Sequence, residues 1–179
     1  MRLKKYILFI TSFFMVFSLH SQELNLNELS DSVYVLNNQF KYDQSINLLN
    51  YYIGKEDNPD KKISLYIQKS YVYKRTFNYP LCLISLLNAD KIVENQSVSE
   101  MSKMEVLYEK SLYYFDVQEY LTSEALSDSI LYNYTEFLTD DIKGKLILQK
   151  GYLYSLNNQL IKAELLYDSA IQYFKKASP

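Results

Sequence analysis

The sequence predicts an all-α protein, a solenoid of about four antiparallel helix hairpins over residues 22–179. Apolar residues recur at i, i+3, i+4 and i+7 along this region, which is the period of an amphipathic helix. Three glycines and three prolines leave few positions that would break a helix. A pattern of small and large residues also recurs four times, at separations of 37, 41 and 40 residues, as in stacked helical repeats.

The recurring pattern explains why the hairpins should stack. Its ideal form is a small residue, a large residue three positions later, a second small residue nine positions further on, and then another large residue. The copies are Val33, Leu36, Ser45, Leu49 and Tyr52; Ser70, Tyr73, Cys82, Leu86 and Ala89; Ser111, Tyr114, Ser123, Ser127 and Ile130; and Gly151, Tyr154, Ala163, Tyr167 and Ala170. A single hairpin cannot bury such an apolar face, so neighbours stack and present a groove.

The N-terminus precedes the repeats and has the features of a secretory signal peptide, residues 1–21. Three basic residues come before an uncharged apolar run, 6–19, which ends in a polar segment, 20–22. This run is 14 residues long, fewer than the roughly 18 to 20 that a membrane-spanning helix needs. We expect cleavage after Ser21 and an exported chain, periplasmic or secreted, with no stable membrane insertion. An uncleaved anchor is the alternative.

Eight helices are expected after the signal peptide, and they pair into four hairpins. We expect helices at 25–39, 42–54, 60–76, 79–93, 98–116, 118–133, 140–157 and 159–176. The hairpins then cover about 27–56, 60–95, 98–135 and 140–176. Each hairpin contains one copy of the pattern, and sustained strand-type alternation occurs nowhere in the chain.

Capping residues mark the starts of three of these hairpins. Asn58 before Pro59 fits an N-cap with proline at the first helical position, where the missing amide hydrogen costs nothing. Ser97 and Glu100 have the spacing of a capping box for the third hairpin. Thr139 is placed to cap the fourth. The first copy has large residues at two small positions, as suits a terminal unit that packs on one side only.

The fourth and second copies carry a family resemblance. The fourth is Ile147, Gly151, Tyr154, Leu160, Ala163, Tyr167 and Ala170, and the second is Tyr66, Ser70, Tyr73, Tyr79, Cys82, Leu86 and Ala89. These residues resemble the tetratricopeptide repeat, in which small residues let two antiparallel helices approach closely and an aromatic fills the gap. The resemblance implies a right-handed solenoid and says little about the ligand. The family's usual 34-residue length and closing proline are absent, which implies longer connections here.

The resemblance also nominates a binding surface, because the first helix of each hairpin lines the concave groove in that family. Residues directly after the first small position should face the groove, and others lie one turn away on the same faces. The candidate partner-binding residues are Tyr34, Asn37, Tyr71, Lys74, Tyr108, Leu112 and Tyr152, with Leu148 and Phe115 beside them. Tyrosines give large contact area at low rotamer cost, which suits an extended or helical peptide. The alternative is that some of these tyrosines belong to the core between repeats.

The reactive groups of the mature chain argue against an enzyme. The only histidine, His20, lies in the expected signal peptide, so nucleophile–histidine pairs and imidazole metal ligands are excluded. Cys82 is the only cysteine and occupies a small buried position. The glycines have no phosphate-binding spacing. We interpret the acidic pair Glu105 and Glu109 as part of a solvated helix face. We therefore predict no catalytic residue, no cofactor and no metal.

The charge balance argues against nucleic acid as a partner. Removing residues 1–21 leaves 16 basic and 21 acidic residues, a net charge near −5, with Arg75 as the only arginine. Phosphate binding depends on clustered lysine and arginine, which an acidic chain of this kind lacks.

These observations favour an exported protein–protein interaction module or scaffold, which binds a peptide or partner domain in a concave, tyrosine-rich groove. The alternative is the N-terminal sensor portion of a larger signalling regulator. A signal peptide followed by such repeats resembles the front of bacterial regulators that continue into a membrane helix and a cytoplasmic output domain.

Overall fold

The computed structural model describes residues 25–178, which form eight α-helices and one short 3-10 helix. They are α2 (Leu26–Asn38), α3 (Tyr42–Ile53), α4 (Pro59–Arg75), α5 (Tyr79–Asn95), α6 (Glu100–Asp116), α7 (Tyr120–Asn133), η1 (Thr135–Phe137), α8 (Asp140–Leu156) and α9 (Leu160–Ala177). The all-α prediction is confirmed over this range, although η1 was not expected. The predicted signal peptide lies outside the described residues.

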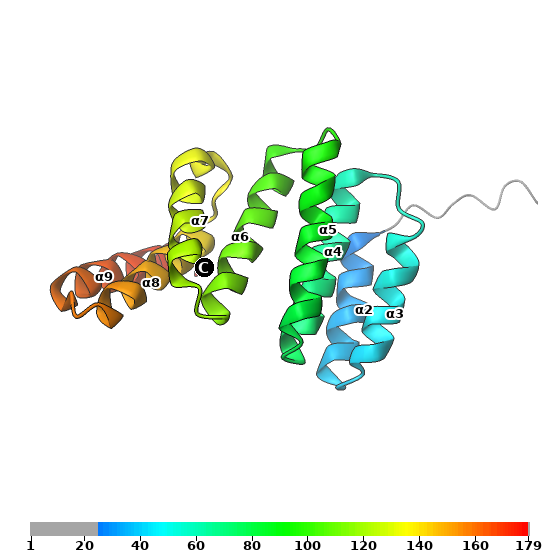
Figure 1. Ribbon diagram of the computed structural model, residues 1–179, viewed down its shortest axis with the longest axis horizontal. Helices are drawn as coiled ribbons and strands as arrows, with labels where there is room; N and C mark the ends of the chain where they lie inside the picture. The colour runs from blue at the N-terminus through cyan, green and yellow to red at the C-terminus, as the bar shows by residue number, and fades with distance from the viewer. Residues whose placement is uncertain (1–24, 179) are drawn as a thin grey trace, which may run out of the picture.

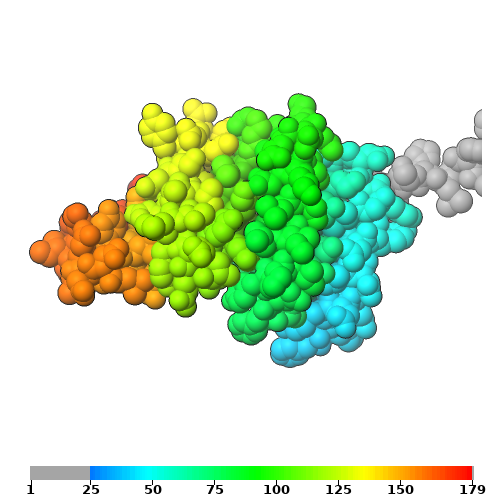
Figure 2. Space-filling model, viewed as in Figure 1, coloured from blue at the N-terminus to red at the C-terminus, as the bar shows by residue number. Residues whose placement is uncertain are grey.

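Consecutive helices pack in pairs, α2 with α3, α4 with α5, α6 with α7 and α8 with α9, and each pair contacts the next. In Figure 1 the pairs follow one another in chain order along the long axis, and α8 and α9 lie across the direction of the preceding helices. Figure 2 shows the same order on the surface. This arrangement is compatible with the predicted helical repeat.

The four turns inside the pairs share one backbone geometry. Each contains one residue with positive φ, namely Phe40, Phe77, Gln118 or Asn158, at φ values from 56° to 66°. The amide after it donates to the carbonyl five residues back, as in Asn78 N to Tyr73 O at 2.9 Å, which closes a helix end of Schellman type. The four residues are 37, 41 and 40 positions apart. Backbone and sequence pattern therefore have the same period.

The small-residue positions of the pattern are buried in every copy. They hold Val33 and Ser45, Ser70 and Cys82, Ser111 and Ser123, and Gly151 and Ala163. The serine hydroxyls find partners nearby. Ser70 Oγ donates to Ile67 O at 2.7 Å, and Ser111 Oγ donates to Tyr108 O at 2.8 Å. The predicted register of the hairpins is therefore confirmed at these positions.

Two glycines let α9 approach α8 closely. A Cβ at Gly151 would lie 2.7 Å from a ring atom of Tyr167, and one at Gly144 would lie 2.6 Å from the ring of Phe174. Both the glycines and the rings are seven residues apart, about two helical turns, so each ring of α9 packs on one glycine of α8. The contact at Gly144 lies outside the predicted pattern.

The helix caps agree with the sequence at two starts and differ at one. Asn58 accepts from Lys61 N at 3.0 Å, and Thr139 accepts from Ile142 N at 3.2 Å, so both predicted caps are confirmed. The predicted capping box at Ser97 is wrong, because Ser99 caps α6. The backbone amide and the hydroxyl of Ser99 both donate to Asp60 Oδ1 of α4 at 2.9 Å. This contact between hairpins selects the later serine.

The hairpins join mainly through contacts of the second helix of one with the first helix of the next, including two ion pairs, and less through their first helices. α2 contacts α4, and α4 contacts α6. Lys110 pairs with Asp90 of α5, and Lys150 pairs with Asp128 of α7. Both lysines directly precede a small position, so this pairing recurs with the pattern. α6 and α8 approach each other less closely than α4 and α6 do.

Candidate functional site

A largely apolar cavity of about 540 Å³ lies between α6 and α8. Its lining residues are Leu112, Phe115, Lys145, Leu148, Gln149, Tyr152 and Tyr167. Two of the predicted partner-binding residues, Leu112 and Tyr152, line it, as do the neighbouring Leu148 and Phe115. This volume lies within the roughly 300–1,000 Å³ of typical ligand pockets.

Three aromatic rings form a cluster at this cavity: Phe115 and Tyr152 line it, and Tyr120 packs against both. The ring of Phe115 lies 5.3 Å from that of Tyr152 and 5.6 Å from that of Tyr120, measured between centroids. The rings of Tyr120 and Tyr152 are 6.4 Å apart, and all three pairs meet at steep interplanar angles. Such edge-to-face contacts are favourable for aromatic quadrupoles. The aromatic cluster therefore joins α6, the start of α7 and α8.

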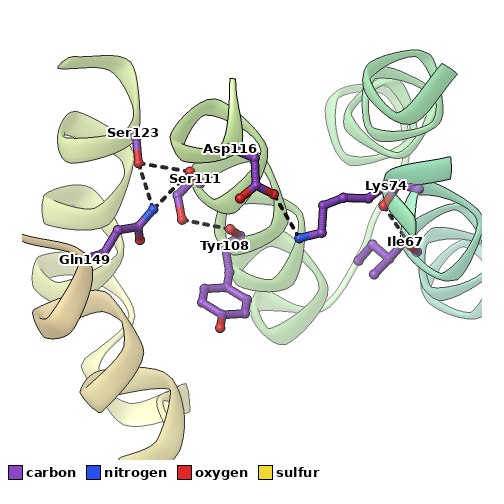
Figure 3. Close-up of polar contacts among 8 residues, drawn as sticks. Ile67, Lys74, Tyr108, Ser111, Asp116, Ser123 and Gln149 are labelled. Atoms are coloured by element: carbon purple, nitrogen blue, oxygen red, sulfur yellow. Dashed lines mark hydrogen bonds and ion pairs between the residues drawn. The ribbon is translucent and has the colours of Figure 1, made fainter. Parts of the chain in front are cut away.

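A buried polar network holds α8 against the third hairpin. Gln149 is 7% exposed, and its Nε2 donates to Ser123 Oγ at 2.9 Å and to Ser111 O at 3.3 Å. Ser123 Oγ in turn donates to Ser111 O at 2.9 Å (Figure 3). The reversed amide would place Oε1 against the carbonyl of Ser111, so this orientation is the favourable one. Gln149 Oε1 is then buried without a hydrogen-bond partner.

The space between α4 and α6 is charged instead. Lys74 Nζ of α4 lies 3.3 Å from Asp116 Oδ2 of α6 (Figure 3). Burial raises the pKa of Glu109, and the positive charge of Lys74 offsets only part of this shift. Burial also raises the pKa of Glu105. The interpretation of these two glutamates as a solvated face is therefore wrong, because neighbouring first helices partly cover them.

The three predicted tyrosines after the small positions are all accessible. Tyr34 on α2, Tyr71 on α4 and Tyr152 on α8 are 64%, 47% and 40% exposed. The guanidinium of Arg75 lies 5.9 Å from the ring centroid of Tyr71. Tyr71 and Tyr152 flank α6 from the helices on either side of it.

The remaining predicted residues are less accessible. Asn37 is 1% exposed, and its Oδ1 accepts from Ser45 Oγ at 2.8 Å, so this amide is used inside the first hairpin. Tyr108 is partly buried, and burial raises the pKa of its phenol. Lys74 is engaged with Asp116, as described above.

Sequence reasoning did not select Lys145, Gln149 or Tyr167, which complete the cavity. A signal for Gln149 existed, because it lies two positions before the small residue of its copy. The same position holds Gln68 in the second copy and Glu109 in the third. A polar residue that recurs on the apolar side of a helix hairpin indicates a contact between repeats.

The side chains outside the cavity offer little reactive chemistry in the described part of the chain. Burial raises the pKa of Cys82 to about 11, so its thiol is protonated at neutral pH. Within residues 25–178, no group of three histidine, cysteine or carboxylate side chains is placed to hold a metal ion. Over the same range, every helix is too short or too polar to cross a membrane.

The geometry provides a largely apolar cavity beside exposed tyrosines and paired charges. Such an arrangement is suited to binding. In comparisons with family models, curated proteins and solved structures, none was found to match this chain. The resemblance to tetratricopeptide repeats therefore rests on the sequence pattern and stays a prediction.

Proposed function

We propose that this protein is an exported interaction module of tetratricopeptide-like repeats, which binds a peptide or partner domain along α4, α6 and α8. The observation that carries the proposal is the apolar cavity between α6 and α8, lined in part by Leu112 and Tyr152. The array of first helices supports it, because it places exposed Tyr71 and Tyr152 on the two helices that flank α6.

We call the surface along α4, α6 and α8, with Tyr71, Leu112 and Tyr152, the groove. Binding in this groove would combine aromatic contact with a set of fixed charges. Tyr71 and Tyr152 provide wide, rigid contact surfaces at little cost in rotamer entropy. Lys74 and Asp116 are held together across the α4–α6 space, so their charges are largely compensated before a partner arrives. A peptide that lies across α6 would therefore gain most of its affinity from apolar and aromatic contacts.

The proposed function is tested by capture of partners from an envelope extract. The bait is residues 22–179, and its matched variant carries Tyr71→Ala and Tyr152→Ala. A control variant carries Tyr51→Ala and Tyr132→Ala, which remove two exposed tyrosines outside the groove. We expect a specific partner, identified by mass spectrometry, that is lost only with the groove variant. Capture that survives the groove substitutions would place the binding surface elsewhere.

A further inference from the structure

We infer that one side of α9, with Leu160, Asp168 and Ile171, is a second docking surface, and that it takes an amphipathic helix of a partner protein. We call this surface the end face. The inference goes beyond the proposed function, because the end face lies outside the groove along α4, α6 and α8. It follows from the way in which the other three hairpins of the same chain cover the equivalent side of their second helices.

In the first three hairpins, the first helix of the next hairpin covers the second helix. α3 packs against α4, α5 against α6, and α7 against α8. Each covering helix has large apolar residues five positions before and two positions after its small residue. All six are buried, namely Leu65 and Val72, Val106 and Tyr113, and Leu146 and Leu153. One of each pair shares a core cluster with the covered helix: Leu65 with Leu49, Val106 with Ala89, and Leu146 with Ile130.

The covered side of a second helix includes the positions three before and eight after its small residue. In the first three hairpins these residues are buried or half-buried: Tyr42 and Ile53, Tyr79 and Asp90, and Tyr120 and Leu131. The same positions of α9 hold Leu160 and Ile171, which are 65% and 48% exposed. These two side chains are apolar at positions that a helix covers three times in this chain. A helix of the same type is therefore the cover that fits them.

Asp168 adds a charge to the end face. It lies five positions after Ala163, as Asp128 lies five positions after Ser123. Asp128 pairs with Lys150 of α8, the residue directly before the small residue of the covering helix. Asp168 is exposed on α9. A lysine at the same position of a docking helix would meet it as Lys150 meets Asp128.

A second copy of this chain does not offer such a helix. Over the described residues, α4, α6 and α8 already cover the hairpins before them, which leaves α2 as the first helix that a copy could present. α2 has the exposed Glu28 five positions before its small residue, and Ser32 in place of the lysine. A carboxylate placed on Leu160 would lose hydration and gain no cation from the end face.

The occupant is therefore specified by three positions along one helix face. It has large apolar residues five before and two after a small residue, and a lysine directly before that residue. Positions separated by four and three residues lie on the same side of a helix, so all three reach the end face together. This is recognition of an amphipathic helix by a helix pair, and it differs in chemistry from the tyrosine contacts of the groove.

The first test uses a peptide that copies α8, residues 139–156, as the probe. A hydrocarbon staple between positions 145 and 152, both exposed in α8, holds the peptide helical. We expect saturable binding to the full chain by fluorescence anisotropy, weakened roughly tenfold or more by Ile171→Asp. Leu165→Asp is the matched control, because the position two after the small residue is exposed in all four second helices. No saturable binding, or equal weakening by the two variants, would overturn the inference.

The second test exchanges charges across the contact. Lys150→Glu in the peptide should weaken binding roughly threefold or more, and Asp168→Lys in the protein should restore it. Weakening that Asp168→Lys does not reverse would overturn the assigned register. A stapled peptide that copies α2, residues 25–38, should bind at least tenfold more weakly than the α8 peptide, because it has Glu28 at an apolar position. Equal binding of the two peptides would overturn the specificity argued above.

The third test identifies the source of the helix by crosslinking. The full chain with p-benzoylphenylalanine in place of Ile171 is irradiated in an extract of the source cells, and the crosslinked segment is identified by mass spectrometry. We expect a segment of another protein with the lysine, the small residue and the two apolar residues at the stated spacing. Crosslinks between copies of this chain, to lipid alone, or to segments without this spacing would overturn the inference.

The groove variant keeps this inference separate from the proposed function. Tyr71→Ala with Tyr152→Ala changes the groove and leaves Leu160, Asp168 and Ile171 intact. We expect it to bind the α8 peptide as the natural chain does. Loss of peptide binding in this variant, with helicity retained by circular dichroism, would move the peptide site to the groove and overturn the end face.

Discussion

The space between α4 and α6 and the space between α6 and α8 use equivalent positions of the repeat in opposite ways. We call them the closed seam and the open seam. At the closed seam, Lys74 bridges to Asp116, and Glu109 lies partly buried beside α4. At the open seam, Gln149 replaces the glutamate, and an apolar cavity of about 540 Å³ remains. The two seams therefore differ in charge, and the open one contains a cavity of ligand size.

This difference shows that the charge of a seam can change through one residue without a change in the register of the repeat. Glu109 and Gln149 both lie two positions before a buried small residue, Ser111 and Gly151. At the closed seam, the positive charge of Lys74, which is paired with Asp116, also acts on the carboxyl of Glu109 and partly offsets the effect of its burial. At the open seam, the carboxamide of Gln149 carries no charge and is hydrogen-bonded to Ser111 and Ser123.

The largest effect is expected when α9 is displaced from α8, because Tyr167 of α9 also lines the cavity of the open seam. Gly151→Leu should destabilise the protein by about 1–3 kcal/mol or more, because its Cβ would meet Tyr167 at 2.7 Å. Urea unfolding followed by circular dichroism measures the loss. Gly54→Leu is the control, since a Cβ there meets its nearest atom at an ordinary 3.5 Å. An unchanged unfolding midpoint for Gly151→Leu would contradict the close packing of α8 on α9.

A smaller effect is expected when the closed seam is given the residue of the open one. Glu109→Gln should stabilise the protein at neutral pH by about 1 kcal/mol, because the buried carboxylate is replaced by a neutral group. The folded pKa of Glu109 lies above its ordinary value of 4.5. The contribution of Glu109 to the stability of the natural protein is therefore fully present below pH 4.5 and is lost as the pH rises through the folded pKa.

The pH dependence separates this explanation from a general effect of removing a charge. The advantage of Glu109→Gln should disappear below pH 4.5, where the glutamate is protonated in both the folded and the unfolded chain. Glu164→Gln, on the exposed face of α9, is the matched control. A gain of equal size at every pH would show that the raised pKa of Glu109 is not its source. The groups that act on this carboxyl are Lys74, Glu105, Lys145 and Asp116.

The smallest effect is expected for a substitution that removes the contact between the first turn of α4 and the N-cap of α6. Asp60→Ala removes both hydrogen bonds to Ser99 and should cost about 0.5–1 kcal/mol, since the site is near the surface. Hydrogen bonds from Ser102 and Ser99 lower the pKa of Asp60 below its ordinary 3.8. Its contribution is present above pH 3.8 and is lost as the pH falls through the folded pKa. A cost that is independent of pH in acid would contradict this assignment.

Much of the fold could be predicted from sequence because it depends on local periodicity. The hairpin register follows from positions such as Ser70 and Cys82, whose small size is visible in the chain and whose burial is confirmed. The caps at Asn58 and Thr139 act within one helical turn, so they too were visible. These features need no knowledge of how one hairpin sits on the next.

The parts that were missed depend on contacts between hairpins. Ser99 replaces Ser97 as the cap of α6 because Asp60 reaches it from α4. The burial of Glu109 and the opening beside Gln149 depend on the spacing of α4, α6 and α8, which a local pattern does not specify. Leu112 and Tyr152 were predicted as binding residues, but the cavity that joins them appears only with the tertiary arrangement.

The shared geometry of the four turns has a consequence for protein engineering. Phe40 and Phe77 adopt the left-handed backbone that Asn158 adopts in the last hairpin, and both rings are more than three-quarters exposed. The left-handed conformation costs a bulky L-residue about 1–2 kcal/mol, and asparagine or glycine avoids most of this cost. Replacing either phenylalanine with asparagine should therefore raise the free energy of unfolding, and neither residue lines the cavity of the open seam. An engineer who stabilised the two turns with asparagine would gain tolerance for redesigning the cavity itself.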